Sequence, residues 1–288
     1  MSDRNAEIKG AGTIASGTYD TIRIKGSGQV DGPVEAKVLK LSGSSNFAGD
    51  VKAGELDSNG SLNIDGKVVA ERFTSAGAAN VRDGLKAGEA ELRGAFTSGS
   101  DISARRVKTQ GAITIDGTLK ADEIDITLRG KSRVHTISGG TIEVRLGDNN
   151  GGGGAGGVSV SMSGSTGAAG ADASAFSFGA GAGGVAFASG GRSTAGTGGR
   201  GGSVSNNVYI ESMTGSAVSV THTGAEEIKL HAETIEGSTV KLEATVANTV
   251  KGARVVIGAG CQIDTVEYTE TLEVDKTSKV GKTVKKTV

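Results

Sequence analysis

The chain has 288 residues with 49 glycines, one proline, six phenylalanines, three tyrosines and no tryptophan, which excludes a wide core filled by aromatic rings. Its 31 basic and 32 acidic residues give a net charge of −1, so no large positive field is available to bind nucleic acid. A single cysteine, Cys261, excludes an internal disulfide, and the sequence has no apolar run of about 18 residues that would predict a membrane span.

The N-terminal sequence MSDRNAEIKGAG is polar and lacks the apolar segment of a signal peptide. Together with the lone cysteine, it favours a cytoplasmic, reducing compartment. Residues 7 to about 20 then form an imperfect opening coil of the pattern that follows, with Gly12, Ile14 and Tyr19 near the expected positions.

Residues from about 21 to 123 repeat every seventeen positions. One column of the repeat is always glycine, one is always alanine and one is always aliphatic. These columns are Gly26, Gly43, Gly60, Gly77, Gly94 and Gly111; Ala36, Ala53, Ala70, Ala87, Ala104 and Ala121; and Val34, Val51, Val68, Leu85, Ile102 and Leu119. A fixed period with invariant small and apolar columns predicts a stacked repeat architecture.

Within each repeat the apolar residues alternate with polar ones, which is typical of short β-strands and argues against a helical repeat. The alternation gives two further inward columns: Ile22, Leu39, Leu56, Phe73, Ala90, Val107 and Ile124; and Val30, Phe47, Ile64, Val81, Ser98 and Ile115. Three apolar columns predict an all-β fold, a parallel β-helix (β-solenoid) with a triangular cross-section and about 17 residues per coil. The glycine column is expected at a corner, where φ is positive or the backbone passes too close for a β-carbon.

The outward columns predict ladders along the axis. One column alternates in charge, through Glu55, Arg72, Glu89, Arg106 and Glu123, so opposite charges fall on adjacent coils. A polar column runs through Gln29, Asn46, Asn63, Asn80, Thr97 and Thr114. Its side chains are expected to hydrogen-bond to one another along the axis, with a ligand-binding surface as the alternative.

The pattern divides the chain into four parts. The N-terminal part of the β-helix covers residues 1–146, and its period loosens after 123. Residues 147–206 are rich in Gly, Ala and Ser, which predicts a flexible insert, with Gly-rich coils that continue the solenoid as the alternative. The C-terminal part of the β-helix covers 207–275. A basic tail at 276–288 is expected to be frayed, with an anionic-surface anchor as the alternative.

No constellation for catalysis, cofactor binding or metal binding is predicted, so we expect a protein that is not an enzyme. A GxGxxG match at Gly196, Gly198 and Gly201 lies inside the insert without a preceding strand, and chance explains it. The three histidines, His135, His222 and His231, are not at ligand spacings, and Cys261 has no nearby base. One column holds Asp31, Asp65 and Asp116, but Ala48, Arg82 and Gly99 separate them, so no carboxylate pair is expected on adjacent coils.

The repeats GSGQVDGPVEAKVLKLSG (26–43), GSLNIDGKVVAE (60–71) and GAITIDGTLKAD (111–122), with the closing stretch at 252–282, resemble the bactofilins, the bacterial polymer-forming cytoskeletal proteins. The closing stretch is similar to the bactofilin-like proteins of Gram-positive bacteria. The resemblance implies a right-handed β-helix that assembles without nucleotide into filaments, which serve as scaffolds for cell shape, envelope proteins or motility. Many members bind membrane through an apolar N-terminal segment, which this chain lacks, so membrane association stays open.

An open solenoid also ends in unpaired strand edges, which are templates for pairing with another copy. The candidate polymer interface is Ile8 and Ile14 at one pole and Val266, Leu272 and Val274 at the other. The first hypothesis is therefore a homopolymer that recruits unidentified protein partners on its sides. A second is a monomeric β-solenoid that binds glycan or another repetitive surface through the Asn/Thr column. A third, a hydrolase or transferase, would need turnover that depends on Asp65 or Asp116.

Overall fold

The computed structural model describes residues 4–147, 208–223 and 228–287, and every regular element in these ranges is a β-strand. The strands are β1 (Asn5–Phe47), β2 (Val51–Ile64), β3 (Val68–Val81), β4 (Leu85–Ser98), β5 (Ile102–Leu128), β6 (Ser132–Leu146), β7 (Val208–His222), β8 (Leu230–Leu242), β9 (Thr245–Ile257), β10 (Gln262–Val274) and β11 (Lys279–Lys285). Of the predicted insert at 147–206, residues 148–206, with the glycines of the GxGxxG match, lie outside the described residues.

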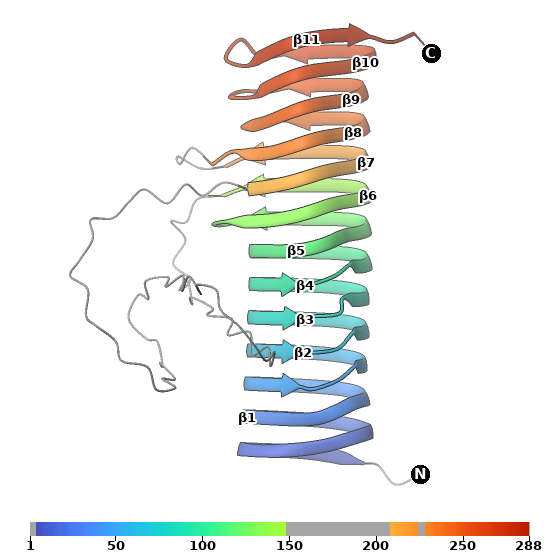
Figure 1. The fold of residues 1–288 in the computed structure, drawn as a ribbon, viewed down its shortest axis with the longest axis vertical. Coiled ribbons are helices and arrows are strands. Elements are labelled where there is room, and N and C mark those ends of the chain that lie inside the picture. Colours follow the sequence, from blue (N-terminus) through green and yellow to red (C-terminus); the bar gives the residue numbers. More distant parts are fainter. Residues whose placement is uncertain (1–3, 148–207, 224–227, 288) are drawn as a thin grey trace, which may run out of the picture. The chain divides into compact units, whose positions relative to one another are not determined.

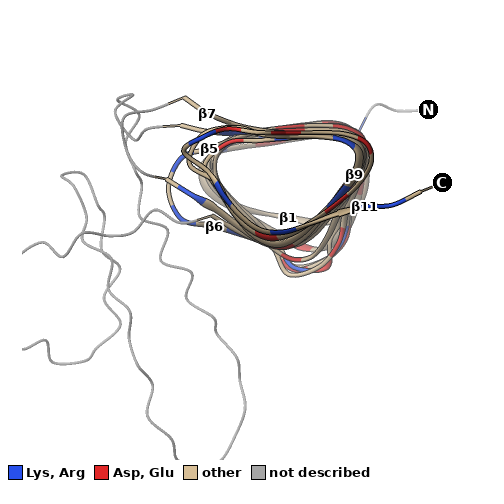
Figure 2. Cartoon of the chain, turned by 90° about the horizontal axis from the view of Figure 1, so that it is seen from above, with Lys and Arg blue, Asp and Glu red and all other residues tan. Residues whose placement is uncertain are grey.

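The eleven strands form one parallel sheet in chain order, from β1 to β11. Each strand bends around the axis and pairs with the strand one turn on, so the chain winds into a right-handed β-solenoid of about 11 turns with about 17 residues per turn (Figure 1). Seen along the axis, the turns superimpose in a triangular outline (Figure 2). The predicted fold class is confirmed. Strands β6 and β7 pair directly, so the solenoid continues across the undescribed segment between them.

The core is a narrow column of aliphatic side chains along the axis. All members of the three predicted inward columns are at most 4% exposed, including Val34, Phe47 and Val68. Burial of each such side chain contributes roughly 1.5–3 kcal/mol, but only when neighbouring turns cover it on both sides. A turn of this solenoid is therefore stable only within the stack.

The glycine column has both properties expected of it. All six glycines have positive φ, between 104° at Gly94 and 140° at Gly111. A β-carbon on any of them would also lie within 3.0 Å of the carbonyl oxygen of the preceding glycine in the column, which for Gly26 is Gly10. This corner therefore excludes every residue with a side chain, by conformation and by contact.

The alanine column continues beyond the regular repeat and becomes glycine. Ala121 pairs with Gly139, and the ladder then runs through Gly215, Gly237 and Gly252. A β-carbon on Gly139 or Gly237 would press on the carbonyl oxygen of the previous turn. A tyrosine follows the small residues on both sides: Tyr268 pairs with Gly252 and, on its other edge, with Lys285, and Tyr19 lies seventeen residues before Ala36. We call this set the small-residue column.

The prediction of a frayed basic tail is wrong for most of residues 276–288. Lys279–Lys285 form β11, which pairs in parallel with β10 from Gln262 to Tyr268. In β11, Val280 lies over the buried Ile263 and Thr283 lies over the buried Val266, so this strand covers the core in spite of its lysines. The solenoid therefore extends past residue 275.

Candidate assembly poles and side ladders

The N-terminal pole is the first turn of β1. Ile8 and Ile14 face inward and are only 7% and 6% exposed, so they lie under the rim and not on an open apolar surface. Tyr19 closes one corner of this pole: its hydroxyl donates to the carbonyl oxygen of Ala15 at 2.8 Å. The Arg4 guanidinium lies over the Tyr19 ring, 4.4 Å from its centroid.

The C-terminal pole is formed by β11 and by the last third of β10. Val266 does not lie on this pole, which corrects its predicted place in the interface: β11 covers it, and it is fully buried. Leu272 and Val274 lie beyond the last residue of β10 that β11 pairs with, Tyr268. Leu272 is partly buried and Val274 is 44% exposed. These two residues remain as candidates at this pole.

Both poles carry charges of both signs. The C-terminal pole carries Glu270, Glu273 and Asp275 together with the lysines of β11 and the residues around it, Lys276, Lys279, Lys282, Lys285 and Lys286, of which Lys286 pairs with Glu267 at 3.0 Å. The N-terminal pole has both signs: Glu7 contacts Lys9 and Lys25, and Asp20 contacts Lys37 at 2.5 Å. The hydrogen bond from Lys37 lowers the pKa of Asp20.

The predicted charge ladder lies on the outside of β2 to β5, and its residues are aligned turn by turn. Arg72 lies 3.8 Å from Glu89, and Arg106 lies 2.8 Å from Glu123. Such exposed pairs contribute at most about 1 kcal/mol each, so the ladder favours one register more than it adds stability.

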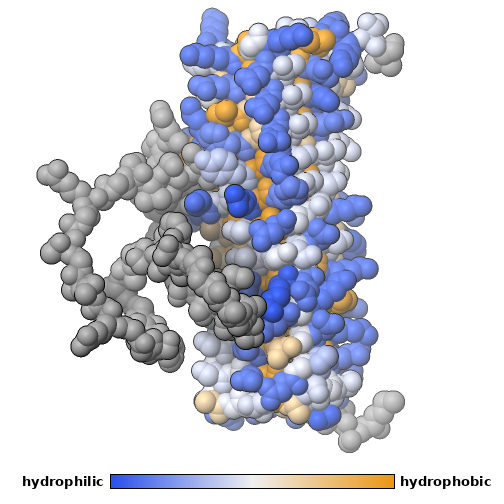
Figure 3. All heavy atoms as spheres, in the orientation of Figure 1, coloured by the Kyte–Doolittle hydropathy of each residue, from blue (hydrophilic) through white to orange (hydrophobic). Residues whose placement is uncertain are grey.

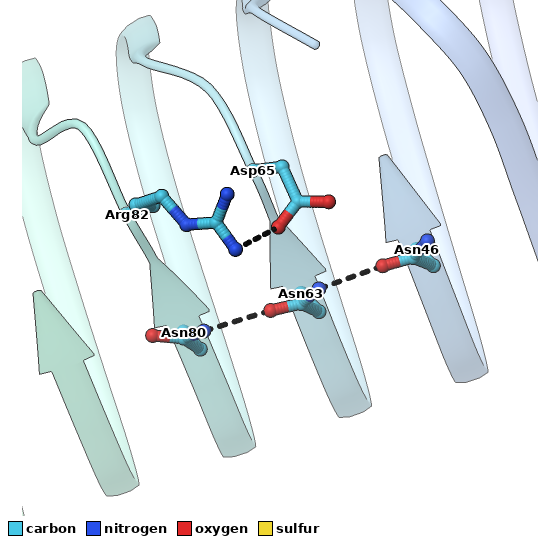
Figure 4. A network of polar contacts seen from close by, with 5 residues as sticks. All are labelled: Asn46, Asn63, Asp65, Asn80 and Arg82. Atoms are coloured by element: carbon cyan, nitrogen blue, oxygen red, sulfur yellow. Dashed lines mark hydrogen bonds and ion pairs between the residues drawn. The ribbon is translucent and has the colours of Figure 1, made fainter. Parts of the chain in front are cut away.

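The polar column forms hydrogen bonds along the axis over three turns. Asn63 Nδ2 donates to Asn46 Oδ1 at 2.7 Å, and Asn80 Nδ2 donates to Asn63 Oδ1 at 2.8 Å (Figure 4). Gln29 departs from the prediction, because it donates to Asp31 of its own turn at 2.7 Å. The amide ladder is thus a structural feature of the central turns.

The same outward column changes character in the C-terminal half, which the sequence analysis did not detect. It continues from Thr114 through Arg133, Tyr209, His231 and Val246. The side chains from Arg133 to Val246 in this column, with the column two residues on, line a surface groove of about 610 Å³. The turns on both sides of residues 148–207 differ in length, so this alignment could not be found by counting residues. Tyr209, one of only three tyrosines in the chain, was a signal in the sequence that could have indicated the groove.

The groove contains one contact between two rings and one contact between a histidine and a carboxylate. Tyr209 is 46% exposed and stacks on the His231 ring, with centroids 5.1 Å apart. Burial lowers the pKa of His231, and the charge of Lys229 adds to this effect. His135 Nδ1 lies 2.5 Å from the Glu211 carboxylate. The groove therefore combines a ring surface with polar groups on successive turns.

The remaining residues that the sequence analysis considered for catalysis, Asp65, Asp116 and Cys261, lie apart from one another in the structure. Asp65 lies 3.0 Å from Arg82 of the next turn, and Asp116 lies at the edge of the groove (Figure 4). Cys261 is buried, which raises the pKa of its thiol. Among the described residues, no group of three or more His, Cys, Asp and Glu side chains could hold a metal ion.

The sides of the solenoid are mostly polar. The face in Figure 3 is largely hydrophilic, with scattered hydrophobic residues. In the described ranges the only large hydrophobic residues that are exposed are Val69, Tyr209 and Val274. These ranges also contain no helix that is long and apolar enough to cross a bilayer.

Comparison with known proteins gives two short matches. The chain is 45% identical over 56 residues to uncharacterized protein YhbE of Bacillus subtilis (strain 168), and 46% identical over 57 residues to uncharacterized protein YhbF of the same strain. The matches cover 19% and 20% of this chain and 24% of each relative, so the chain spans about a quarter of the length of the curated relatives it matches. No family model and no solved structure matches the chain.

Proposed function

We propose that this protein is a structural scaffold that joins its own copies end to end into filaments without nucleotide. The observation that carries the proposal is that the sheet is open at both ends: β1 and β11 are the outermost of its eleven strands. An outermost strand has a row of backbone N–H and C=O groups along one edge that the sheet leaves unpaired, and such an edge is a template for pairing with another chain. The resemblance to the bactofilins supports the same assignment.

The sides of the solenoid are the surfaces on which such a filament would recruit envelope, cell-shape or motility partners. The charge ladder and the amide ladder lie on the central turns, with successive turns about 4.8 Å apart, so each copy in a polymer would present both ladders again. We propose a cytoplasmic location, which agrees with the single free cysteine, and no catalytic role.

Electron microscopy of the purified protein, without nucleotide and over a range of salt and protein concentrations, tests this function. We expect unbranched filaments whose diffraction contains a reflection near 4.8 Å along the filament axis, because the strands lie across it. Particles that stay monomeric under all these conditions would rule the proposal out.

A second candidate is a binding module for glycan or another repetitive surface. The groove around Tyr209 favours it, because an aromatic ring beside carboxylate, amide and guanidinium groups suits a sugar ring and its hydroxyls. This candidate predicts that Tyr209→Ala, or replacement of Asn46, Asn63 and Asn80 by alanine, abolishes binding on a glycan array while assembly stays unchanged. Filament loss in the same variants would count against it.

A further inference from the structure

We infer that the groove on β5 to β9 is the site at which the rod holds a partner protein, and that it takes an extended segment in which lysine or arginine alternates with apolar residues. This inference rests on the recruitment of partners that is part of the proposed function, and it adds the place and the chemistry of the contact. It does not require filaments, because the groove lies on the side of a single copy.

The groove runs along the axis between two outward columns. The strands that line it, β5 to β9, follow one another along the solenoid (Figure 1). Neighbouring strands in a sheet lie about 4.8 Å apart, so the groove is about 19 Å long. An extended chain advances about 3.3 Å per residue, and a groove of this length would hold about six residues.

The two walls of the groove differ in chemistry. One wall, which we call the ring wall, consists of Tyr209, His231 and Val246, aligned on successive turns. The rings of Tyr209 and His231 stack on each other, so they form one continuous surface along the axis. The opposite wall, which we call the carboxylate wall, carries Asp116, Glu211 and Glu233.

This pair of walls suits an extended chain with alternating side chains. Successive side chains of an extended segment point to opposite sides. A segment that lies along the groove would therefore turn every second residue to the ring wall and the others to the carboxylate wall. Apolar residues fit the first wall and basic residues fit the second.

The carboxylate wall lacks the charge pairing of the central turns. It belongs to the column of Asp65, which pairs with Arg82 of the next turn at 3.0 Å. In the groove, Glu211 and Glu233 instead follow each other on adjacent turns, between the aligned residues on either side of them. Like charges on adjacent strands are destabilising, so a cation at this wall would relieve an unfavourable contact of the rod itself.

Two of the three carboxylates also have no ion-pair partner among the described residues. His135 contacts the carboxylate of Glu211 and offsets its charge when the ring is protonated. Asp116 and Glu233 are exposed and, within the described part of the chain, form no hydrogen bond or ion pair through their side chains. Both carboxylates are therefore available to an incoming donor.

Charge distinguishes a basic segment from the other ligands that a groove with an aromatic ring could hold. The three carboxylates share the groove with one fixed positive charge, that of Arg133. A neutral sugar would leave the excess negative charge in place, and an anionic ligand would add to it. Lysine and arginine side chains would neutralise it and would donate charge-assisted hydrogen bonds to the carboxylates.

The spacing of the carboxylates matches that of alternate residues in an extended chain. Asp116 lies on β5 and Glu233 on β8, three steps from turn to turn, or about 14 Å. The first and fifth residues of an extended segment are about 13 Å apart. Three basic residues at alternate positions would therefore reach from one end of the carboxylate wall to the other, with the two apolar residues between them against the ring wall.

Binding of synthetic peptides tests the inference. The probe is a fluorescein-labelled peptide of three Lys-Val repeats with blocked ends, and fluorescence anisotropy at low ionic strength measures its Kd. The peptide Lys-Lys-Lys-Val-Val-Val has the same composition without the alternation, and three Glu-Val repeats reverse the charge. We expect the alternating basic peptide to bind about tenfold more tightly than either control. Equal binding of the block peptide would reveal only a general attraction of cations and would overturn the inference.

Substitutions in each wall locate the site. Glu233→Gln is expected to raise the Kd of the alternating peptide about three- to fivefold, the range for one exposed ion pair. Tyr209→Ala is expected to raise it about tenfold, because the ring surface is lost. Glu236→Gln removes the same charge from an exposed position of β8 outside the groove, and it should leave the Kd unchanged. Thermal melts check that the three variants fold. A wild-type Kd for Glu233→Gln would overturn the assignment of the carboxylate wall.

The outcomes separate this inference from the assembly of filaments. Peptide binding by rods that stay monomeric would support the groove although it overturns end-to-end assembly. Filaments that bind none of the peptides would overturn the groove and leave the assembly standing. Neutral oligosaccharides that bind where the peptides do not would overturn the inference in favour of the second candidate function.

Discussion

Gly60 lies directly over Gly43, and the carbonyl oxygen of Gly43 occupies the space that a β-carbon on Gly60 would need. The φ of Gly60 is +131°, which side chains also disfavour. The two effects act on the same residue, and the glycine column repeats them at each turn.

Gly60→Ala is therefore expected to destabilise the protein strongly. Strained φ alone costs on the order of 1–3 kcal/mol, and the contact with Gly43 adds to it. Gly130→Ala is the matched control, since Gly130 has a φ of +94° but open space around a β-carbon. Urea unfolding of both variants measures the difference, and equal losses would mean that the contact is relieved at no cost.

Val68→Asp is expected to prevent stable folding. Val68 is fully buried, so the new carboxylate would have no solvent and no partner, at a cost of about 3–5 kcal/mol. Val69→Asp, at the neighbouring exposed position, is the control and should change stability by less than about 0.5 kcal/mol. Thermal melts followed by circular dichroism test the pair. An unchanged melting temperature for Val68→Asp would mean that this column does not face the core.

Asn63→Ala should cost about twice as much as Asn46→Ala. Asn63 takes part in two hydrogen bonds of the amide ladder and Asn46 in one. Each bond contributes roughly 0.5–1.5 kcal/mol. Chemical denaturation of the two variants gives the ratio, and equal effects would show that the bonds along the axis contribute nothing measurable.

Removal of residues 276–288 should lower the melting temperature, because it uncovers Val266 and leaves β10 as the last strand. Loss of burial for one aliphatic side chain is worth roughly 1.5–3 kcal/mol. Replacement of Lys279 and Lys282 by glutamine keeps the strand and serves as the control for charge. A truncated chain with wild-type stability would restore the prediction of a frayed tail.

The stability of the C-terminal half should fall at mildly acidic pH through His231. The pKa of this histidine is lowered in the folded state by burial, so the unfolded chain takes up the proton first. The stabilisation is fully present above the ordinary pKa of about 6.5 and is lost as pH falls through it toward the folded value. His231→Gln should flatten the dependence of the urea midpoint on pH between about 7.5 and 5, whereas an unchanged slope would assign that dependence to other groups.

The sequence predicted the central turns well because their repeat has a constant length. From β2 to β4 each turn has seventeen residues, so Val51, Val68 and Leu85 fall into one column by counting alone. The positive φ of the glycine column followed from the residue type, since few other causes place glycine at a fixed interval.

Counting failed where the turns change length. The ladder steps by nineteen residues from Ile115 to Val134 and by fifteen from Leu230 to Thr245. The glycines that replace alanine in the small-residue column, and the groove around Tyr209, therefore could not be aligned by period. Strand β11 was missed for a different reason: its lysines gave it a solvated composition, although Val280 continues the inward column of Ile263.

In this solenoid the backbone hydrogen bonds between turns run parallel to the long axis (Figure 1). The ladders of hydrogen bonds between turns are arranged in series along the axis. A pull on the two ends would therefore place the whole force on every ladder, and the shortest ladder would break first. That is the contact between β10 and β11, with only seven residues in the last strand. A tether under tension would thus shed its terminal strand before its middle deforms, whereas compression would press every turn against the next.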